Sequence, residues 1–540
     1  MSKINRIVVD LTPVLPGGEN GGAKIMTMEL IRDLAVMEPQ CEFVLLTSDK
    51  SHDELAALNA PNVRRKLTRV TSRAESGAIS LGKRLLARFP MGVRVRLAAL
   101  YFKLIRQRRR SAGPMELLEA DLLFCPFTAP YYHHSTIPTV SVVYDLQYRS
   151  YPQFFTSEEL YHREQTLQDA CRLADEIVCI SEYVRESVLK HASVDPARVH
   201  TIHIQLPQRL PMVEPEISAS LLAKLSLEAN AFLLYPANFW PHKNHEMLLT
   251  AFGMYRARNP ASGLKLVCTG TPGSRRDYII EAASRMGLGP WVIFSGYLRN
   301  EEFAALMKEC FAVIYPSLYE GFGMPIVEAM VARKPVLCSR VASIPEIAAD
   351  AAIYFDPKRP TEIVSAIEDI VSNPGLVAEL IDKGVARAQQ FFNPMRMASQ
   401  YWSVFERATD NNRCEESLSG VFHDRWCSEL INISYGPNPG SRELHITLRA
   451  PAWLPRQVEV QDHCSGQSLK LKKGQFIHMT RTLGSGGGRI RFDLSPAFQP
   501  AYLGMGEDQR MVTCKIECCQ IVNNSGETRN LLQAETHIEV

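Results

Sequence analysis

The sequence of 540 residues lacks any uncharged apolar run of about 18 residues, the length that indicates a membrane-spanning helix. Its first residues, Met1 to Arg6, lead directly into an apolar strand pattern, without the features of a secretory signal. The net charge is only +2, from 60 Lys and Arg against 58 Asp and Glu, so no overall field favours nucleic acid. We therefore expect a cytoplasmic protein that binds anionic ligands through a local site.

Patterns that would hold a metal are also missing. The 13 cysteines include no Cys-x-x-Cys pair, and no His-x3-His spacing accompanies them, which argues against a disulfide framework or a zinc site. The closest group, Cys514, Cys518 and Cys519, fits one strand with alternating faces better than a metal cage. No Asp-x-Asp stands at a suitable strand end, so we expect no obligatory metal and no cofactor.

Short apolar runs alternate with helical patterns over most of the chain, in two series. The strands predicted in the first series are Ile7–Leu11, Glu42–Thr47, Asp121–Pro126, Val140–Leu146 and Glu176–Ser181, with a helix from about Lys24 to Met37. Those of the second are Phe232–Ala237, Leu264–Gly270, Val292–Gly296, Phe311–Pro316 and Pro335–Ser339. The alternation predicts an α/β fold with two doubly wound parallel sheets, whose strand-to-helix loops line a cleft.

The pattern changes after a helical run at Met395–Ala408. Apolar and polar residues then alternate with period two between turn residues, which predicts an all-β, sandwich-like region. We expect a Rossmann-like domain at 1–210, a second at 211–390, a helix at 391–408 that packs back on the first domain, a linker at 409–420 and a β-rich accessory domain at 421–540.

The densest chemical signal is Tyr315-Pro-Ser-Leu-Tyr-Glu-Gly-Phe-Gly-Met-Pro-Ile-Val-Glu-Ala-Met. A strand ends at Pro316, and a helix begins near Met324 after a glycine-bearing loop, so backbone N–H groups and the positive helix end favour a phosphate there. Glu320 and Glu328 flank this loop and can accept hydrogen bonds from the hydroxyls of a hexose and a ribose. For one isolated glutamate, a loop carboxylate or a solvated helix residue is the alternative.

This string resembles the signature of glycosyltransferase family 4, whose members are retaining enzymes of the GT-B fold. The resemblance covers roughly residues 1–408 and implies an acceptor-side first domain and a second domain that binds the nucleotide-sugar donor. In the family the first glutamate contacts the donor sugar and the second the nucleotide ribose. The resemblance assigns these roles to Glu320 and Glu328, with Gly321, Phe322, Gly323 and Met324 around the phosphates.

A second motif, Tyr235-Pro-Ala-Asn-Phe-Trp-Pro-His-Lys-Asn-His, follows the first strand of the second series. We expect Lys243 to open the next helix, where an ammonium can reach a leaving diphosphate. Family members usually carry an arginine just upstream, and here Asn238 or His242 occupies that region. The diphosphate then relies more on Lys243 and backbone amides, or on a basic group from elsewhere. This variant looks like bacterial mannosyltransferases of O-antigen and capsule assembly, which implies GDP-mannose; His245 as a loop-packing residue is an open alternative.

Three further groups take their roles from the resemblance. Tyr297 and Leu298 end a strand where family members hold the base. Gly21 and Gly22 fall where the first loop meets the donor phosphate and the acceptor. Asp145 stands at the sugar pocket, where Tyr144 replaces the histidine that often precedes it. A turn cap is the alternative for Asp145.

Residues 81–110 contain ten Lys or Arg and no Asp or Glu, interleaved with apolar side chains. This segment fits the surface of an anionic membrane, where a lipid-linked sugar acceptor would be found. A solvated helical face over a core stripe is the alternative.

Together these features predict a retaining, metal-independent hexosyltransferase that moves a hexose, mannose from GDP-mannose by similarity, to a glycan or lipid-linked acceptor in surface polysaccharide or lipopolysaccharide synthesis. The expected catalytic residues are Glu320, Lys243 and Asp145. The enzyme would be cytoplasmic and peripheral at the inner face of the membrane. Two alternatives remain: a non-catalytic protein that binds nucleotide sugar or glycan, and another GT-B enzyme such as a nucleotide-sugar epimerase.

Overall fold

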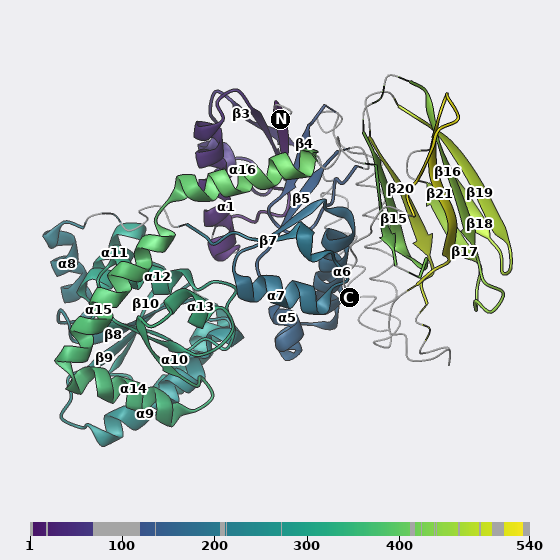
Figure 1. Ribbon diagram of the computed structural model, residues 1–540. Coiled ribbons are helices and arrows are strands. Elements are labelled where there is room, and N and C mark those ends of the chain that lie inside the picture. The colour runs from purple at the N-terminus through teal and green to yellow at the C-terminus, as the bar shows by residue number, and fades with distance from the viewer. Residues whose placement is uncertain are drawn as a thin grey trace.

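The structure is a computed structural model (Figure 1). It describes residues 4–17, 20–68, 119–134, 137–205, 211, 213–271, 273–410, 416–422, 424–436, 438, 440–462, 465–484, 488–498, 500 and 512–532. The basic segment 81–110, with the membrane contact predicted for it, lies outside these residues. Within the described part of the chain, every helix is too short or too polar to cross a bilayer.

The first domain is a seven-stranded parallel sheet in the order β3-β2-β1-β4-β5-β6-β7. Its strands are β1 (Arg6–Asp10), β2 (Glu42–Thr47), β3 (Val63–Leu67), β4 (Leu122–Cys125), β5 (Thr139–Val143), β6 (Glu176–Cys179) and β7 (Val199–Thr201). Its helices include α1 (Gly21–Met37), α5 (Gln147–Ser150), α6 (Ser157–Leu173) and α7 (Glu182–His191). The central strands β4, β5 and β6 are buried along their whole length, because helices cover both faces of the sheet.

The second domain is a six-stranded parallel sheet in the order β10-β9-β8-β11-β12-β13. The strands are β8 (Phe232–Pro236), β9 (Lys265–Thr269), β10 (Val292–Gly296), β11 (Ala312–Tyr315), β12 (Val336–Ser339) and β13 (Ala352–Phe355). The helices are α8 (Pro215–Leu225), α9 (His245–Arg258), α10 (Ser274–Arg285), α11 (Asn300–Glu309), α12 (Met324–Val331), α13 (Ile344–Ala348), α14 (Pro360–Ser372) and α15 (Pro374–Ala388). The strand order reverses between β8 and β11, so the loops after these two strands form the crevice where such sheets bind ligands.

Helix α16 (Pro394–Asp410) leaves the second domain and lies along the first (Figure 1). Its Tyr401 and Phe405 pack edge to face on Phe124 of β4, with ring centroids 5.8 and 5.1 Å apart. Because aromatic pairs in this geometry add to the burial of apolar surface, the helix fastens the end of the second domain to the first sheet.

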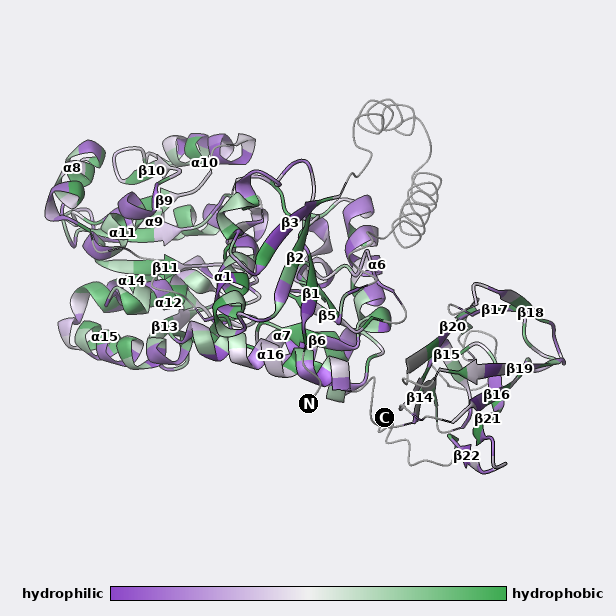
Figure 2. Ribbon diagram, turned by 90° about the horizontal axis from the view of Figure 1, so that it is seen from above, coloured by the Kyte–Doolittle hydropathy of each residue, from purple (hydrophilic) through white to green (hydrophobic). Residues whose placement is uncertain are grey.

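The carboxyl-terminal region consists of two antiparallel sheets, in the orders β14-β15-β20-β17-β18 and β19-β16-β21-β22. The strands are β14 (Ser417–Val421), β15 (Cys427–Tyr435), β16 (Arg442–Arg449), β17 (Val458–Asp462), β18 (Ser468–Leu471), β19 (Phe476–Leu483), β20 (Gly488–Ser495), β21 (Lys515–Asn523) and β22 (Thr528–Asn530). Strand β14 begins inside the range 409–420 that the sequence assigns to a linker. Figure 2 shows this β-domain on the side of the first domain away from the second, and its buried apolar residues form a core of their own. The predicted fold class is confirmed.

The cysteines follow the strand pattern of this domain. Cys514 and Cys519 are buried and Cys518 is partly exposed, so the group lies on and beside one strand. Among the described residues, no group of three or more His, Cys, Asp or Glu could hold a metal ion.

A buried ion pair joins the β-domain to the first domain. Arg491 on β20 donates to the carbonyl oxygen of Leu173, 3.2 Å away, and lies 3.4 Å from the carboxylate of Asp175. Only 3% of the Arg491 side chain and 2% of the Asp175 side chain are exposed. Arg172 of α6 and Asp493 of β20 form a second ion pair at 3.3 Å. The end of α6 and the outer face of β20 therefore form the contact.

We expect Arg491→Met to loosen the β-domain, because it removes the buried cation that faces Asp175 across this contact, and breaking a buried ion pair costs about 3–5 kcal/mol. Thermal unfolding of the full chain should begin at lower temperature, and limited proteolysis should release the β-domain sooner. Arg456→Met, at an exposed loop position of the same domain, is the matched control. An unchanged cleavage pattern in Arg491→Met would show that this contact does not hold the domain.

Candidate active site

Lys243 and Glu320 form an ion pair at the carboxyl ends of β8 and β11. The Lys243 Nζ lies 2.6 Å from Glu320 Oε1, and their side chains are only 10% and 11% exposed. The same ammonium donates to the hydroxyl of Tyr315, the last residue of β11, at 3.1 Å. The two motifs of the sequence thus converge on one buried pair of charges.

The loop after β8 places Lys243 through its backbone. Lys243 ends a short 3-10 turn, Pro241–Lys243, and does not open α9 as the sequence predicts. Asn244 separates the two in a left-handed conformation with φ 62°. The Asn244 side-chain amide donates to the carbonyls of Pro316 at 3.0 Å and Pro357 at 2.8 Å, which ties this loop to the one after β11. Asparagine suits this position, since it tolerates the left-handed region and its amide supplies two donors.

The local field keeps the carboxyl group of Glu320 ionised. Burial acts to raise the pKa of Glu320, but the charge of Lys243 and the influence of His242 outweigh it and lower that pKa below its ordinary value. Burial, assisted by Lys243, lowers the pKa of His242 to about 4. His242 is therefore neutral at pH 7, and the ammonium of Lys243 is the cation beside Glu320.

His245 is a packing residue in this structure. Its ring lies 4.7 Å from the ring of Tyr235 and 4.6 Å from that of Phe239, and 2% of the residue is exposed. Burial and then Lys243 lower its pKa to about 3, so it stays neutral. This is the packing alternative that the sequence left open.

The loop from Glu320 to Met324 lies against the first domain. A Cβ atom on Gly321 would stand 2.1 Å from the carbonyl oxygen of Tyr144, so no larger residue fits without a backbone shift. The Tyr319 hydroxyl accepts a hydrogen bond from the Leu146 amide at 3.3 Å, and Ser181 donates to the Gly321 carbonyl at 2.7 Å. The donor loop predicted from the sequence is therefore fixed by residues of the other domain.

The predicted glycines of the first loop lie against side chains of the second domain. Gly21 and Gly22 are the first residues of α1, which begins earlier than the predicted Lys24. A Cβ atom on Gly21 would lie 3.4 Å from the indole of Trp240, and one on Gly22 would lie 2.0 Å from the methyl carbon of Met324. The start of α1 thus faces both motifs of the second domain.

Asp145 is near this pair but is also a turn cap. Its carboxylate accepts a hydrogen bond from the Gln147 amide at 3.0 Å, which is the alternative that the sequence left open. Burial, with a smaller effect from Glu320, raises its pKa. The Tyr144 hydroxyl pairs with Thr27 at 3.1 Å, so this phenol is held by α1.

The remaining predicted residues lie around the second domain's crevice. Glu328 is buried in α12, with 3% of the residue exposed. Asn238 accepts hydrogen bonds at 3.0 Å from the amide and the hydroxyl of Thr271, and so fixes the loop after β9. Tyr297 is 70% exposed, and Leu298 packs partly on the core. Gly323 directly precedes α12 in a left-handed conformation with φ 97°, and the side chain of Phe322 in the same loop is buried.

The sequence did not identify three polar residues that hold the site. Tyr315 lies inside the quoted motif but reads as the end of an apolar strand. Ser343 donates to the Glu320 carbonyl at 3.0 Å, and Ser181 donates to Gly321 from the first domain. The serine at the start of a helix was the available signal for both, but only the folded chain shows what they reach.

Comparisons with known proteins show similarity to glycosyltransferases. Residues 222–387 match the family model described as "Glycosyl transferases group 1". The chain is 24% identical to O-antigen chain mannosyltransferase B of Escherichia coli over 68% of this chain and 91% of that protein. It is 25% identical to O-antigen chain mannosyltransferase RfbU of Salmonella typhimurium over 45% of this chain and 65% of that protein.

Two solved structures share the fold of about three quarters of this chain. One is Anabaena HepE in complex with UDP and glucose, with a TM-score of 0.54 and 16% identity over 74% of this chain and 99% of that chain. The other is WaaG, a glycosyltransferase involved in lipopolysaccharide biosynthesis, with a TM-score of 0.52 and 14% identity over 75% of this chain and 98% of that chain. The resemblance to glycosyltransferases of the GT-B fold is confirmed.

We expect Lys243→Met to destabilise the second domain by about 3–5 kcal/mol, because Glu320 stays buried without its partner. The melting temperature should fall by roughly 2–4 °C per kcal/mol, and the double variant Lys243→Met/Glu320→Gln should melt higher than Lys243→Met alone. Folding lowers the pKa of Glu320 below its ordinary value of 4.5. The pair's contribution to the free energy of unfolding is therefore present above pH 4.5 and is lost as the pH falls below that value. Additive losses in the two single variants would contradict the pairing.

Proposed function

We propose that this chain is a retaining mannosyltransferase, which moves mannose from GDP-mannose to a hydroxyl of a glycan or lipid-linked acceptor in surface polysaccharide synthesis. The observation that carries the proposal is the buried pair of Lys243 and Glu320 beside the start of α12. The two relatives, both named as O-antigen chain mannosyltransferases, support the choice of sugar.

Lys243 has the charge and the hydrogen-bonding capacity for a leaving diphosphate. An ammonium has three N–H donors, and those of Lys243 reach Glu320 and Tyr315, which leaves one for a phosphate oxygen. The amides at the start of α12 add the positive end of a helix on the other side of the same loop. These groups stabilise the negative charge that develops as the bond to the sugar breaks.

The carboxylates take the hydroxyl-rich parts of the donor. Glu320, ionised and held by Lys243, accepts hydrogen bonds from the mannose, and Glu328 accepts them from the ribose. In a retaining transfer the acceptor hydroxyl attacks the sugar carbon from the face that the diphosphate leaves. Asp145, on the first domain, borders the pocket from the acceptor side.

The chain lacks the arginine that usually precedes Lys243 in the family, and we assign its role in part to the first domain. Arg163 on α6 lies close enough for its charge to act on both Asp145 and His242. With Lys243 and the helix amides it supplies the positive charge of the site, so the proposed reaction requires no divalent cation. The proposed location is the inner face of the cytoplasmic membrane, where residues 81–110 would meet anionic lipid.

We expect nucleotide diphosphate release from GDP-mannose and not from other GDP- or UDP-sugars, and we expect added acceptor to stimulate it. Glu320→Gln and Lys243→Met should each lower turnover by about 100-fold or more, since each removes a charge that acts on the reacting groups. Glu281→Gln, at an exposed position of α10, is the matched control. Conversion to a free epimerised sugar would indicate an epimerase, and binding without release would indicate a sugar-binding protein.

We expect Gly321→Ala to lower turnover by about 100-fold, because the added methyl group meets the Tyr144 carbonyl and displaces the donor loop by an ångström or so. Gly289→Ala is the control, since a Cβ atom there meets nothing within 4 Å. Steady-state kinetics with GDP-mannose would compare the two. Equal turnover in both variants would mean that the close approach of the domains at Gly321 does not matter for the reaction.

A further inference from the structure

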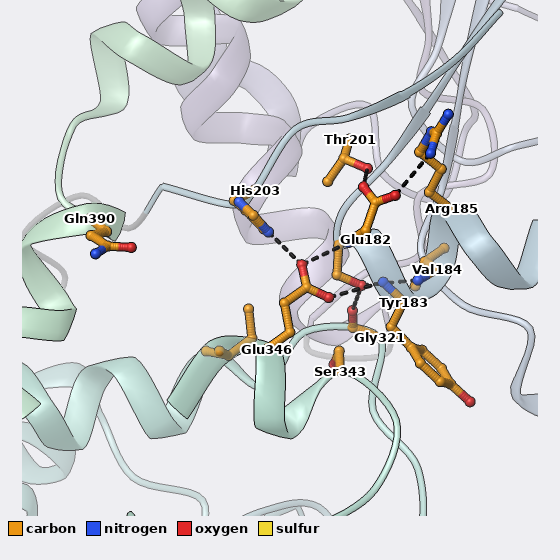
Figure 3. Close-up of polar contacts among 12 residues, drawn as sticks. Glu182, Tyr183, Val184, Arg185, Thr201, His203, Gly321, Ser343, Glu346 and Gln390 are labelled. Atoms are coloured by element: carbon orange, nitrogen blue, oxygen red, sulfur yellow. Dashed lines mark hydrogen bonds and ion pairs between the residues drawn. The ribbon is translucent and has the colours of Figure 1, made fainter. Parts of the chain in front are cut away.

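A carboxylate of the second domain receives three hydrogen bonds from the first (Figure 3). Glu346, on α13, accepts from the backbone amides of Glu182 at 2.7 Å and Tyr183 at 2.9 Å. His203 Nε2 lies 2.5 Å from the same carboxylate. These contacts join residues separated by more than 140 positions in the sequence.

The contact supplies hydrogen-bond acceptors to the free backbone amides at the start of helix α7. The first amides of a helix have no partner within the helix and carry partial positive charge. Ser181 accepts a hydrogen bond from the Val184 amide at 3.3 Å, and Glu346 accepts from the two amides before it. Burial acts to raise the pKa of Glu346, but His203 and these amides lower it, so the group is a carboxylate at neutral pH.

The charge of Glu182 does not oppose this arrangement. In Figure 3 its carboxylate turns away from Glu346, and it accepts from the Thr201 hydroxyl at 2.6 Å and from Arg185 at 2.9 Å. Only the backbone amide of Glu182 faces Glu346. The start of α7 therefore presents donors, and not a second negative charge, to the other domain.

The same helix start holds the donor loop. Ser181, directly before α7, donates to the Gly321 carbonyl at 2.7 Å, and Ser343, directly before α13, donates to the Glu320 carbonyl at 3.0 Å. Arg387 of α15 donates hydrogen bonds to two backbone carbonyls of α13, those of Ile347 at 2.9 Å and of Glu346. The position of α13 against α7 thus sets the position of the loop that contains Glu320.

The contact also lies where the chain passes between the domains. His203 follows β7 on the first crossing, and its ring lies 5.9 Å from that of Phe391, just before α16 on the second crossing. Phe322 of the donor loop completes this group, 6.2 Å from His203 and 5.6 Å from Phe391. The contact of Glu346 therefore lies beside both segments that join the two domains, next to the Glu320–Met324 loop.

We propose that Glu346 is a positioning residue whose carboxylate fixes the second domain against the start of α7 and thereby holds Glu320 and Gly321 against Tyr144 and Asp145. The effect of Glu346 on turnover rests on the proposed function, whereas the effect of Glu346 on the contact between the domains does not. Glu346 touches no substrate in this account and acts through the loop that it holds in place.

Hydrogen exchange of the full-length chain, followed by mass spectrometry, tests the contact directly. In Glu346→Ala the amides of Glu182 and Tyr183 should exchange about ten-fold faster than in the wild type, and those of the Gly321 loop should follow. Glu346→Gln keeps the volume and one carbonyl acceptor, so its effect should be smaller. Glu379→Gln, at a position of α15 that is 57% exposed, is the matched control and should exchange as the wild type does.

Kinetics and binding separate positioning from general damage. Turnover of GDP-mannose should fall by about 100-fold in Glu346→Ala, with partial recovery in Glu346→Gln, because a small displacement of the loop removes the reactive geometry. The Kd for GDP should stay within about three-fold, since the proposed function assigns the ribose to Glu328 and the diphosphate mainly to Lys243 and the start of α12, all inside the second domain. Unchanged exchange at Glu182 and Tyr183, or equal losses in turnover and GDP affinity, would overturn the proposal. If the wild type turns over no donor, the proposed function fails while the exchange result still decides the contact.

Discussion

The ion pair between Lys243 and Glu320 is the interaction on which the rest of this site depends. Two opposite charges that are almost fully removed from water are stable only when each has the other and further hydrogen bonds. The Tyr315 hydroxyl accepts a hydrogen bond from Lys243. The hydrogen bond from Asn244 to the Pro316 carbonyl and the one from Ser343 to the Glu320 carbonyl hold the two loops in place. The pair places a fixed cation within hydrogen-bond distance of a fixed carboxylate, which is the arrangement that the proposed transfer of a sugar from a diphosphate uses.

The pair is buried because two domains meet over it. Each sheet presents the carboxyl ends of its strands, and the loop at Gly321 leaves no room for a side chain where it meets the first domain. The contacts from Ser181, Tyr319 and Glu346 all cross the same boundary. The site is therefore a property of the domain arrangement as much as of the two motifs, and mutations at the boundary should act on the chemistry without contacting the donor.

Much of the fold follows from the sequence alone. Continuous apolar runs such as the one at Phe232 predict buried parallel strands, and the strand-loop-helix context of the motifs places Lys243 and Glu320 in the crevice. What could not be predicted depends on contacts between distant segments. The sequence leaves a packing role open for His245, and its neighbours Tyr235 and Phe239 decide for it. The turn that separates Lys243 from α9 and the cross-domain contact of Glu346 rest on neighbours that no local pattern reveals. The buried Arg491 is a further case, because its exposed-strand pattern gives no sign of Asp175 in another domain.

The central claim is that Lys243 binds the diphosphate and Glu320 the sugar, and equilibrium binding tests it most directly. Titration calorimetry would compare GDP and GDP-mannose on the wild type, Lys243→Met and Glu320→Gln. We expect Lys243→Met to weaken the binding of both ligands by about 10- to 100-fold, because it removes a hydrogen bond to a charged group. We expect Glu320→Gln to leave GDP binding unchanged and to weaken the binding of GDP-mannose, since it acts only on the part of the affinity that mannose adds. If Glu320→Gln weakened GDP as much as GDP-mannose, or if Lys243→Met left GDP affinity unchanged, this division of roles would be wrong.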